Sequence, residues 1–340
     1  MEPKSVQYRW LIAAGIALTV LLLAGGWLWW QFQPVGKGSL RLVRITPGMS
    51  ARQIGQKLQQ MGIIRRAWTF EWVVRWKGWG SRLKPGQYEL RPNMSPQQIA
   101  RIIAEGRVAT SWVTIPEGYT IRQIARLLEE RGVAEAEEFV RLATTEGDTF
   151  KASFPLPKNL EGYLFPNTYR FPRGTGARPA IQAMISLLDR EVYQKYRAEI
   201  EGSGFTFHQI LTIASMIERE AKVPEDRPLI SAVIRNRLRR GMRLEIDATV
   251  LYALGVHKSR VLYRDLDVDS DYNTYRRKGL PPGPIANPGS ACIEAALRPA
   301  QVDYLYYVAR PDGSHIFTRT LQEHHVAVAR ARRERARAIP

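Results

Sequence analysis

The stretch TFHQILTIASMIEREA places two glutamates, Glu218 and Glu220, two positions apart in an apolar run. Helical periodicity predicts a helix over 206–221, and Thr206 with Gln209 forms a capping box that marks its start. At about 100° per residue, Glu218 falls inside the apolar arc and Glu220 on the other flank. Burial disfavours a charged carboxylate, so this placement predicts that Glu218 keeps a proton and acts as a general acid. The competing interpretation is an edge glutamate paired with an arginine.

The first thirty residues predict a membrane anchor. The segment from Trp10 to Trp30 is almost wholly apolar and uncharged, and as a helix it spans roughly 30 Å, the thickness of the hydrocarbon layer. Tryptophans stand at both ends, as in an aromatic belt, and WLWWQF offers no small-residue cleavage site. Basic residues flank both ends and do not decide the orientation. We expect an uncleaved anchor with residues 1–9 as a short cytoplasmic tail and the remainder exported.

The chain has 340 residues and a formal charge of +18, from 50 Lys and Arg against 32 Asp and Glu. Nucleic acid is the usual partner of so basic a chain, but a membrane anchor argues against it and no aromatic-basic RNA-binding signature occurs. Anionic lipid or an anionic envelope polymer is the favoured partner. Cys292 is the single cysteine, so no intramolecular disulfide can form and the redox compartment stays undetermined.

A repeated phrase organises the first third of the chain. Ile45 begins ITPGMSARQI, Ile115 begins IPEGYTIRQI, and a weaker copy, RPNMSPQQI, begins at Arg91. Each copy predicts a strand, a turn and a short helix opened by a capping box. The order strand, helix, helix, strand over residues 40–90 resembles a LysM module, the small fold that binds N-acetylated sugar chains.

Three tryptophans, Trp68, Trp72 and Trp76, lie at i, i+4 and i+8 within this segment. That spacing places all three on one stripe of a helix. We expect the stripe to be part of the core, the alternative being a platform for sugar rings.

Four stretches further along the chain carry a specific resemblance: EGYLFPNTY, ASMIEREA, NRLRRGMRLEIDATVLYALG and YNTYRRKGLPPGPIANPG. In this order, behind an N-terminal anchor and followed by YLYYVARPDGSHIFTRTLQEH, they resemble the endolytic murein transglycosylases, the MltG-type or YceG-like family. The resemblance covers roughly residues 40–330.

The resemblance implies a membrane-anchored enzyme that cuts nascent peptidoglycan internally. Such an enzyme cleaves the MurNAc–GlcNAc β-1,4 bond and leaves 1,6-anhydro-MurNAc ends. The catalytic glutamate of the family lies in the phrase matched by SMIE, so this role falls on Glu218. One carboxyl group suffices because the muramic C6 hydroxyl replaces water: Glu218 protonates the glycosidic oxygen and then accepts the C6 proton.

Weaker candidates for substrate binding occur in the same motifs: Asn273, Tyr272, Tyr275, Glu161, Tyr163 and Asp247. Asn273 and the two tyrosines near it carry amide and phenol groups suited to N-acetyl and hydroxyl recognition. Glu161 and its aromatic neighbours either line a sugar groove or form a turn. For Asp247, a helix N-cap is favoured over a catalytic role.

The predicted fold class is α+β: a single transmembrane helix, a small LysM-like βααβ module and a mixed α+β catalytic domain. The predicted boundaries are a tail (1–9), the anchor (10–30), a linker (31–39), the LysM-like module (40–107), the catalytic domain (108–330) and a basic tail (331–340). A helix is expected over about 177–200. Strands near Val113, Leu305 and His315 are expected to form a small sheet behind the catalytic helix.

No cofactor or metal is expected, because the five histidines lack metal-ligand spacing and no glycine-rich phosphate loop occurs. The expected partners are peptidoglycan strands, membrane lipid and cell-wall synthases, with no nucleic acid. The expected location is the cytoplasmic membrane, with the catalytic domain outside. The alternative function is a non-catalytic scaffold that binds glycan and recruits synthases.

Overall fold

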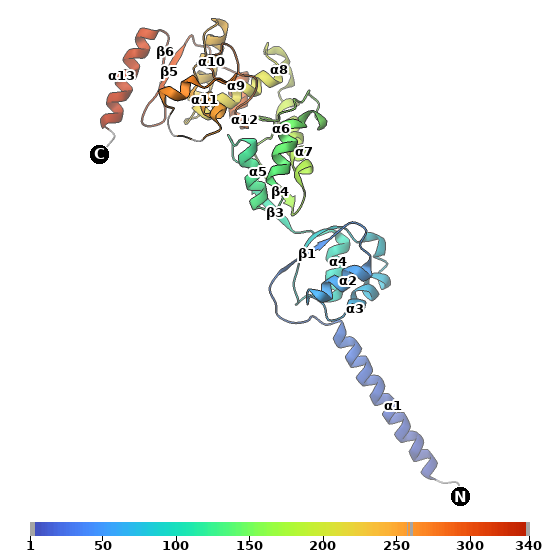
Figure 1. Ribbon diagram of the computed structural model, residues 1–340. Coiled ribbons are helices and arrows are strands. Elements are labelled where there is room, and N and C mark those ends of the chain that lie inside the picture. Colours follow the sequence, from blue (N-terminus) through green and yellow to red (C-terminus); the bar gives the residue numbers. More distant parts are fainter. Residues whose placement is uncertain (1–3, 257, 259–260, 338–340) are drawn as a thin grey trace. The chain divides into compact units, whose positions relative to one another are not determined.

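The computed structural model describes residues 4–256, 258 and 261–337 (Figure 1). It divides the chain into two compact units, the first formed by residues 1–111 with 172–174 and the second by residues 112–171 with 175–340. The division falls close to the predicted boundary at 107/108. Each unit has its own hydrophobic core.

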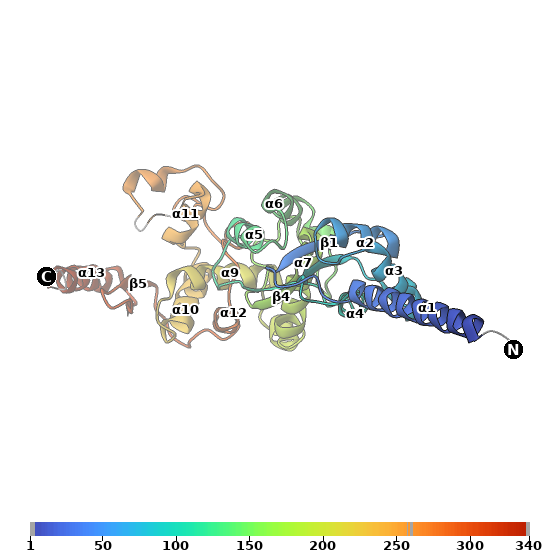
Figure 2. The same cartoon turned by 90° about the horizontal axis from the view of Figure 1, so that it is seen from below.

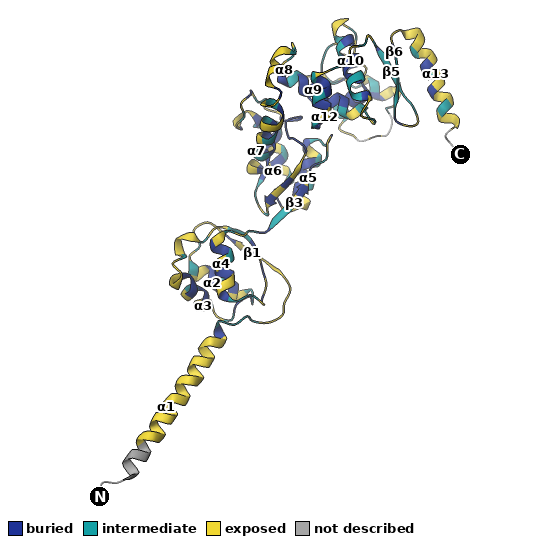
Figure 3. Ribbon diagram, turned by 180° about the vertical axis from the view of Figure 1, so that it is seen from behind, coloured by how far each residue is buried: buried dark blue, intermediate teal, exposed yellow. Residues whose placement is uncertain are grey.

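The first unit begins with the long helix α1 (Lys4–Gln31). Within α1, the segment Trp10–Gln31 is long and apolar enough to cross a membrane, and none of its most apolar window is buried by the rest of the protein. From Trp10 on, Figure 3 shows α1 in the colour of exposed residues except at its end next to the module, where Gln31 is buried. The remaining elements are β1 (Arg41–Ile45), α2 (Ala51–Gln60), α3 (Ala67–Trp76), η1 (Gly80–Arg82), β2 (Gly86–Leu90) and α4 (Pro96–Glu105).

The predicted order strand, helix, helix, strand is confirmed. β1 and β2 pair in an antiparallel sheet in which Arg41 lies opposite Leu90. The predicted capping boxes Ser50–Gln53 and Ser95–Gln98 both form at the starts of α2 and α4. Local capping chemistry therefore fixes where these short helices begin.

The expectation that the three tryptophans of α3 are core residues is wrong. Trp68, Trp72 and Trp76 are 38%, 51% and 65% exposed. The buried face of α3 is instead formed by Thr69, Phe70, Val73 and Val74. The spacing correctly predicted one stripe, but the smaller apolar side chains provide a second stripe, and that one packs into the core.

The second unit contains mainly helices. Its elements are β3 (Thr110–Thr114), α5 (Ile121–Glu130), α6 (Ala136–Thr145), η2 (Gly147–Thr149), β4 (Thr168–Pro172), α7 (Ala177–Leu188), η3 (Asp189–Tyr193), α8 (Arg197–Gly202), α9 (Phe207–Glu220), α10 (Asp226–Arg239), α11 (Asp247–Leu254), η4 (Tyr263–Asp267), α12 (Ser290–Leu297), β5 (Tyr306–Ala309), β6 (His315–Thr318) and α13 (Leu321–Arg337). The single helix predicted over 177–200 is interrupted: η3 is a π-helical turn between α7 and α8.

The strands do not form the predicted common sheet. β3 pairs with β4 and β5 pairs with β6, so these are separate two-stranded sheets. Helix α9 packs instead against α10, α11 and α12, and Figure 2 shows α10 and α12 beside it. All eight residues from Ile210 to Ile217 are buried. A helix that is apolar on every side must be covered on every side, and helices provide that cover here.

Candidate active site

Helix α9 carries both candidate glutamates near its C-terminal end. It begins at the predicted capping box, in which the side chain of Thr206 accepts a hydrogen bond from the backbone of Gln209. Glu218 and Glu220 are both half-buried, so the predicted difference in their burial is wrong. Because the buried run covers the whole circumference of α9, a helical wheel has no polar face against which to rank them.

Glu218 binds the N-terminus of α12. Its Oε2 accepts a hydrogen bond of 2.9 Å from the backbone N–H of Gly289, the residue that caps α12. The Cys292 thiol, one turn into α12, is buried, and both burial and its hydrogen bond to Glu218 raise its pKa. The carboxyl group of Glu218 is therefore held in place by two donors of one helix.

A second carboxyl group, Glu117, lies beside Glu218. Burial raises the pKa of Glu117, the negative charge of Glu218 raises it further, and Arg227 opposes both. The backbone of the next residue also approaches closely, because a Cβ added at Gly118 would lie 3.4 Å from Cγ of Glu218. We call Glu117 and Glu218 the carboxyl pair.

Glu117 is not among the site residues predicted from the sequence. It lies in IPEGYT, the second copy of the repeated phrase, where the first copy, ITPGMS, has Pro47 in the equivalent position. This carboxyl group, which stands in one copy of the repeat and not in the other, is the sequence signal that could have indicated Glu117 as a site residue.

Gly289 leaves room for the carboxyl pair to assemble. A Cβ at this position would lie 1.9 Å from Oε1 of Glu117. We expect Gly289→Ala to displace the flexible end of Glu117 from Glu218 while the fold persists. The predicted result is a loss of activity of roughly tenfold with little change in melting temperature. Glycan cleavage assays and thermal unfolding would check it, and a large fall in melting temperature would contradict it.

Glu161, a predicted substrate-binding residue, is buried among backbone groups. Its Oε1 accepts hydrogen bonds from the backbone N–H of Ile121, at 3.0 Å, and from the amide of Asn287, at 2.9 Å. The same amide donates to the backbone oxygen of Tyr119, and its oxygen accepts from the N–H of Leu164. Glu161 and Asn287 thus connect three segments, one of which follows Glu117 directly and another of which precedes Gly289. This role favours structure over contact with sugar.

Burial raises the pKa of Glu161 from its ordinary value of 4.5 to about 8. Between these values the folded chain holds a proton that the unfolded chain has released, so the free energy of unfolding falls as the pH rises. Between about pH 6 and pH 9 we expect the melting temperature of the wild type to fall. In Glu161→Gln, whose side chain stays neutral, that fall should be roughly 5 °C smaller. Parallel pH-dependent melting of the two proteins measures this, and identical curves would contradict it.

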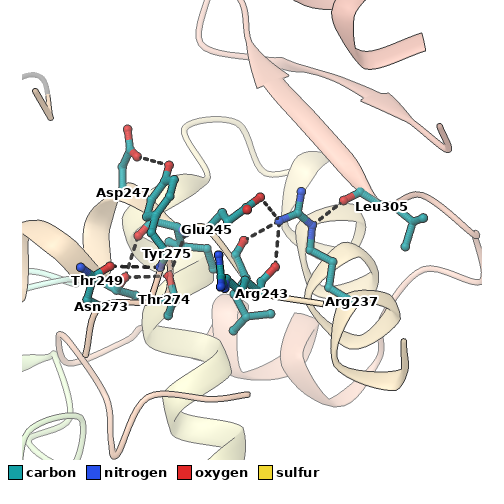
Figure 4. Close-up of polar contacts among 11 residues, drawn as sticks. Arg237, Arg243, Glu245, Asp247, Thr249, Asn273, Thr274, Tyr275 and Leu305 are labelled. Carbon is teal, nitrogen blue, oxygen red and sulfur yellow. Dashed lines mark hydrogen bonds and ion pairs between the residues drawn. The ribbon is translucent and has the colours of Figure 1, made fainter. Parts of the chain in front are cut away.

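Glu220 belongs to a different cluster. The hydroxyl of Tyr307 donates to its Oε2 at 3.2 Å, and burial together with the charge of Asp247 raises the pKa of Glu220 to about 7. The hydroxyl of Tyr275 in turn donates to Asp247 at 2.6 Å (Figure 4). The prediction that Asp247 is the N-cap of α11 is wrong, because Asp247 is the first residue of the helix and Ile246 is its N-cap.

Asn273 is fully buried in the loop that leads to Tyr275. Its amide donates to the backbone oxygens of Leu266 and Val268, both at 2.8 Å, and its oxygen accepts from the N–H of Tyr275. The neighbouring Thr274 bonds Thr249 of α11, as Figure 4 shows. These bonds use the polar atoms of Asn273 inside the protein, which favours a role in shaping the loop.

The two remaining predicted residues also pack internally. Tyr163 is buried, and its hydroxyl lies 2.9 Å from Nδ1 of His208 on α9. Tyr272 is half-buried, with its ring 4.9 Å from that of Tyr252. Of the seven predicted site residues, Glu218 alone is therefore a member of the carboxyl pair, and the other six make contacts elsewhere.

The chain is similar to known proteins over most of its length. The model of the YceG-like family matches residues 43–330, which is most of the chain and includes both units. The chain belongs to the YceG-like family. It is 38% identical over 328 residues to the endolytic murein transglycosylase of Bacillus subtilis, covering 90% of each protein.

Other YceG-like relatives are more distant or known by structure. The endolytic murein transglycosylase of Streptococcus pneumoniae strain D39 is 30% identical over 347 residues, which is 91% of this chain and 63% of that protein. The crystal structure of a YceG-like protein from Listeria monocytogenes has 38% sequence identity and a TM-score of 0.57, and the match covers 86% of this chain and 99% of that one.

The described part of this YceG-like chain contains no group of three or more His, Cys, Asp or Glu suited to a metal ion. One cavity, of about 360 Å³, lies between α5 and α6 and includes Arg122 and Arg141 in its lining. A second, of about 440 Å³, lies in the first unit near Glu89 and Asn93. The carboxyl pair lines neither of these cavities, so acid–base chemistry and not an enclosed pocket identifies the candidate site.

Proposed function

We propose that this chain is a membrane-anchored endolytic murein transglycosylase in which Glu218 is the general acid and base. The observation that carries the proposal is the carboxyl pair at the N-terminus of α12, in a chain whose family relatives bear that name. The substrate is the glycan strand of peptidoglycan, and the cleaved bond is the β-1,4 bond from MurNAc to GlcNAc.

The reaction needs a proton donor and then an acceptor at one place. Glu218 protonates the glycosidic oxygen as the bond from C1 of MurNAc breaks, and the oxygen of the C6 hydroxyl forms a new bond to C1. The C6 proton passes to the carboxylate, which restores the acid. Because the attacking group is part of the same sugar, it gains effective molarity and no water molecule is consumed.

The carboxyl group of Glu117 interacts electrostatically with that of Glu218. Two carboxyl groups that lie side by side do not both ionise readily, and such a pair titrates as a unit. The raised pKa of Glu117 fits this behaviour. In this proposal Glu117 acts through Glu218 as a positioning residue.

Anchoring is part of the proposal. The apolar segment Trp10–Gln31 spans the cytoplasmic membrane once, and the two units face the cell wall. The N-terminal tail stays in the cytoplasm. Anchored in this way, the site acts on strands close to the membrane, where new glycan is made, and cell-wall synthases are the partners we expect there.

The test uses the full chain in detergent micelles with uncrosslinked glycan strands of uniform length. The proposal expects strands cut at internal positions, with fragments of intermediate length appearing before disaccharides. Release of disaccharides alone would contradict internal cleavage. Retention of full-length strands on the protein, with no shortening, would support the scaffold alternative.

A further inference from the structure

A row of exposed tryptophans runs along α3 in the first unit. Trp68, Trp72 and Trp76, which we call the tryptophan row, occupy successive turns, and the rings of Trp72 and Trp76 stack 5.6 Å apart. The eight steps from Trp68 to Trp76, at about 1.5 Å each, give the row a length of roughly 12 Å. An exposed apolar stripe of this size needs a partner outside the fold.

The tryptophan row begins where α1 ends. The ring of Phe32, the residue after α1, lies 5.5 Å from that of Trp68 and 5.4 Å from that of Trp72. Figures 1 and 3 show α3 at the end of the module from which α1 leaves. The row is therefore continuous with the end of the proposed membrane span.

The connection between α1 and the module is fixed by specific contacts. The guanidinium of Arg65 lies 4.0 Å above the ring of Trp30 and donates to the backbone oxygen of Pro34 at 3.0 Å. The N–H of Val35 donates to the backbone oxygen of Pro92 at 2.9 Å. These contacts hold the row at the level of the last turn of α1, which is the depth at which interfacial tryptophans lie.

The charge of the module suits the same surface. Residues 32–111 contain 14 Lys and Arg against three Glu, a net formal charge of +11. Lys77 follows the row directly, with its Nζ 4.2 Å above the ring of Trp76. Aromatic rings at the headgroup level beside basic side chains are the pattern that binds a bilayer with anionic lipid.

We propose that the tryptophan row is a second membrane contact, which lays α3 on the outer surface of an anionic bilayer next to the anchor. The inference rests on the proposed anchoring by α1 and extends it. A single helix can tilt and rotate, whereas a helix with a contact beside it holds its module in one orientation. The LysM-like module is then a base on the membrane surface, and the row is unavailable as a platform for sugar.

The test places a nitroxide label on the full chain at Lys77→Cys, in nanodiscs with about 30% phosphatidylglycerol. Labelling of the native cysteine is low because Cys292 is buried. The ratio of label accessibility, oxygen over a water-soluble nickel chelate, reports depth in the lipid. We expect Trp72→Gln with Trp76→Gln to lower this ratio about threefold. Trp112→Gln, an equally exposed tryptophan outside the row, should leave it unchanged.

Three results would overturn the inference. The first is an equal ratio with and without the row, and the second is the same decrease in amphipol, where no bilayer exists. The third is a label open to the nickel chelate in nanodiscs and shielded only when glycan strands are added, which would make the row a sugar platform. Retention of the protein on liposomes after a carbonate wash tests anchoring by α1 separately. Loss of the protein in the wash overturns both the proposed anchor and the second membrane contact. Cleavage assays in detergent test catalysis alone.

Discussion

Glu218→Gln should abolish cleavage of glycan strands, with a loss of activity of about 10³-fold or more. The substitution keeps the volume and one hydrogen-bond acceptor for the N–H of Gly289, but it removes the titrating proton. We therefore expect a melting temperature close to that of the wild type. Strand length by chromatography and thermal unfolding on the same preparation would measure both effects.

Glu220→Gln is the matched control on the same helix. Glu220 is half-buried like Glu218, but it bonds Tyr307 and lies in the cluster around Asp247. Its neutral replacement should keep much of the activity, because the contacts of Glu220 lie in that cluster and those of Glu218 at the start of α12. If Glu220→Gln were inactive and Glu218→Gln active, the assignment of the acid would be wrong.

Glu117→Gln should lower activity roughly tenfold to a hundredfold and change the alkaline limb of the pH profile, because Glu117, whose pKa is raised, no longer titrates. Burial and the negative charge of Glu218 raise the pKa of Glu117, and a neutral amide in its place removes that titrating group. A pH–rate profile separates this effect from simple structural damage, which would lower the rate without moving the limb. Equal loss at every pH would contradict the coupling.

Asp247→Asn provides a second control for the carboxyl pair. Asp247 is held by Tyr275 and interacts with Glu220. We expect a modest decrease in activity with an unchanged pH profile. A variant as inactive as Glu218→Gln would instead make Asp247 a second catalytic carboxylate, as in a conventional glycosidase.

Local patterns predicted much of the fold because they depend on neighbours in sequence. The capping boxes at Ser50, Ser95 and Thr206 formed as expected. Each of these features needs only three or four consecutive residues.

Long-range packing limited the rest. Whether Trp72 or Val73 faces the core depends on which stripe of α3 packs against α2 and α4, and both stripes are apolar. The pairing of the strands near Val113 and Leu305 could not be predicted either, because their partners are set by the tertiary fold.

The candidate site was predicted in part for the same reason. Glu218 stood out through its position in an apolar helix and a specific motif, whereas Glu117 reaches it from a loop about one hundred residues earlier in the chain. Asn273 has a side chain suited to N-acetyl groups, yet its bonds to Leu266 and Val268 turn it inward. Residue type predicts what a group can bind, but burial decides what it meets.

Mass analysis of the glycan ends released by the full chain tests the central claim most directly. Attack by the C6 hydroxyl predicts that every new muramic end is a 1,6-anhydro sugar, lighter by one water than a reducing end. Reducing muramic ends, with Glu117→Gln or Asp247→Asn as inactive as Glu218→Gln, would contradict the account. They would show a two-carboxylate hydrolase in place of a lytic transglycosylase.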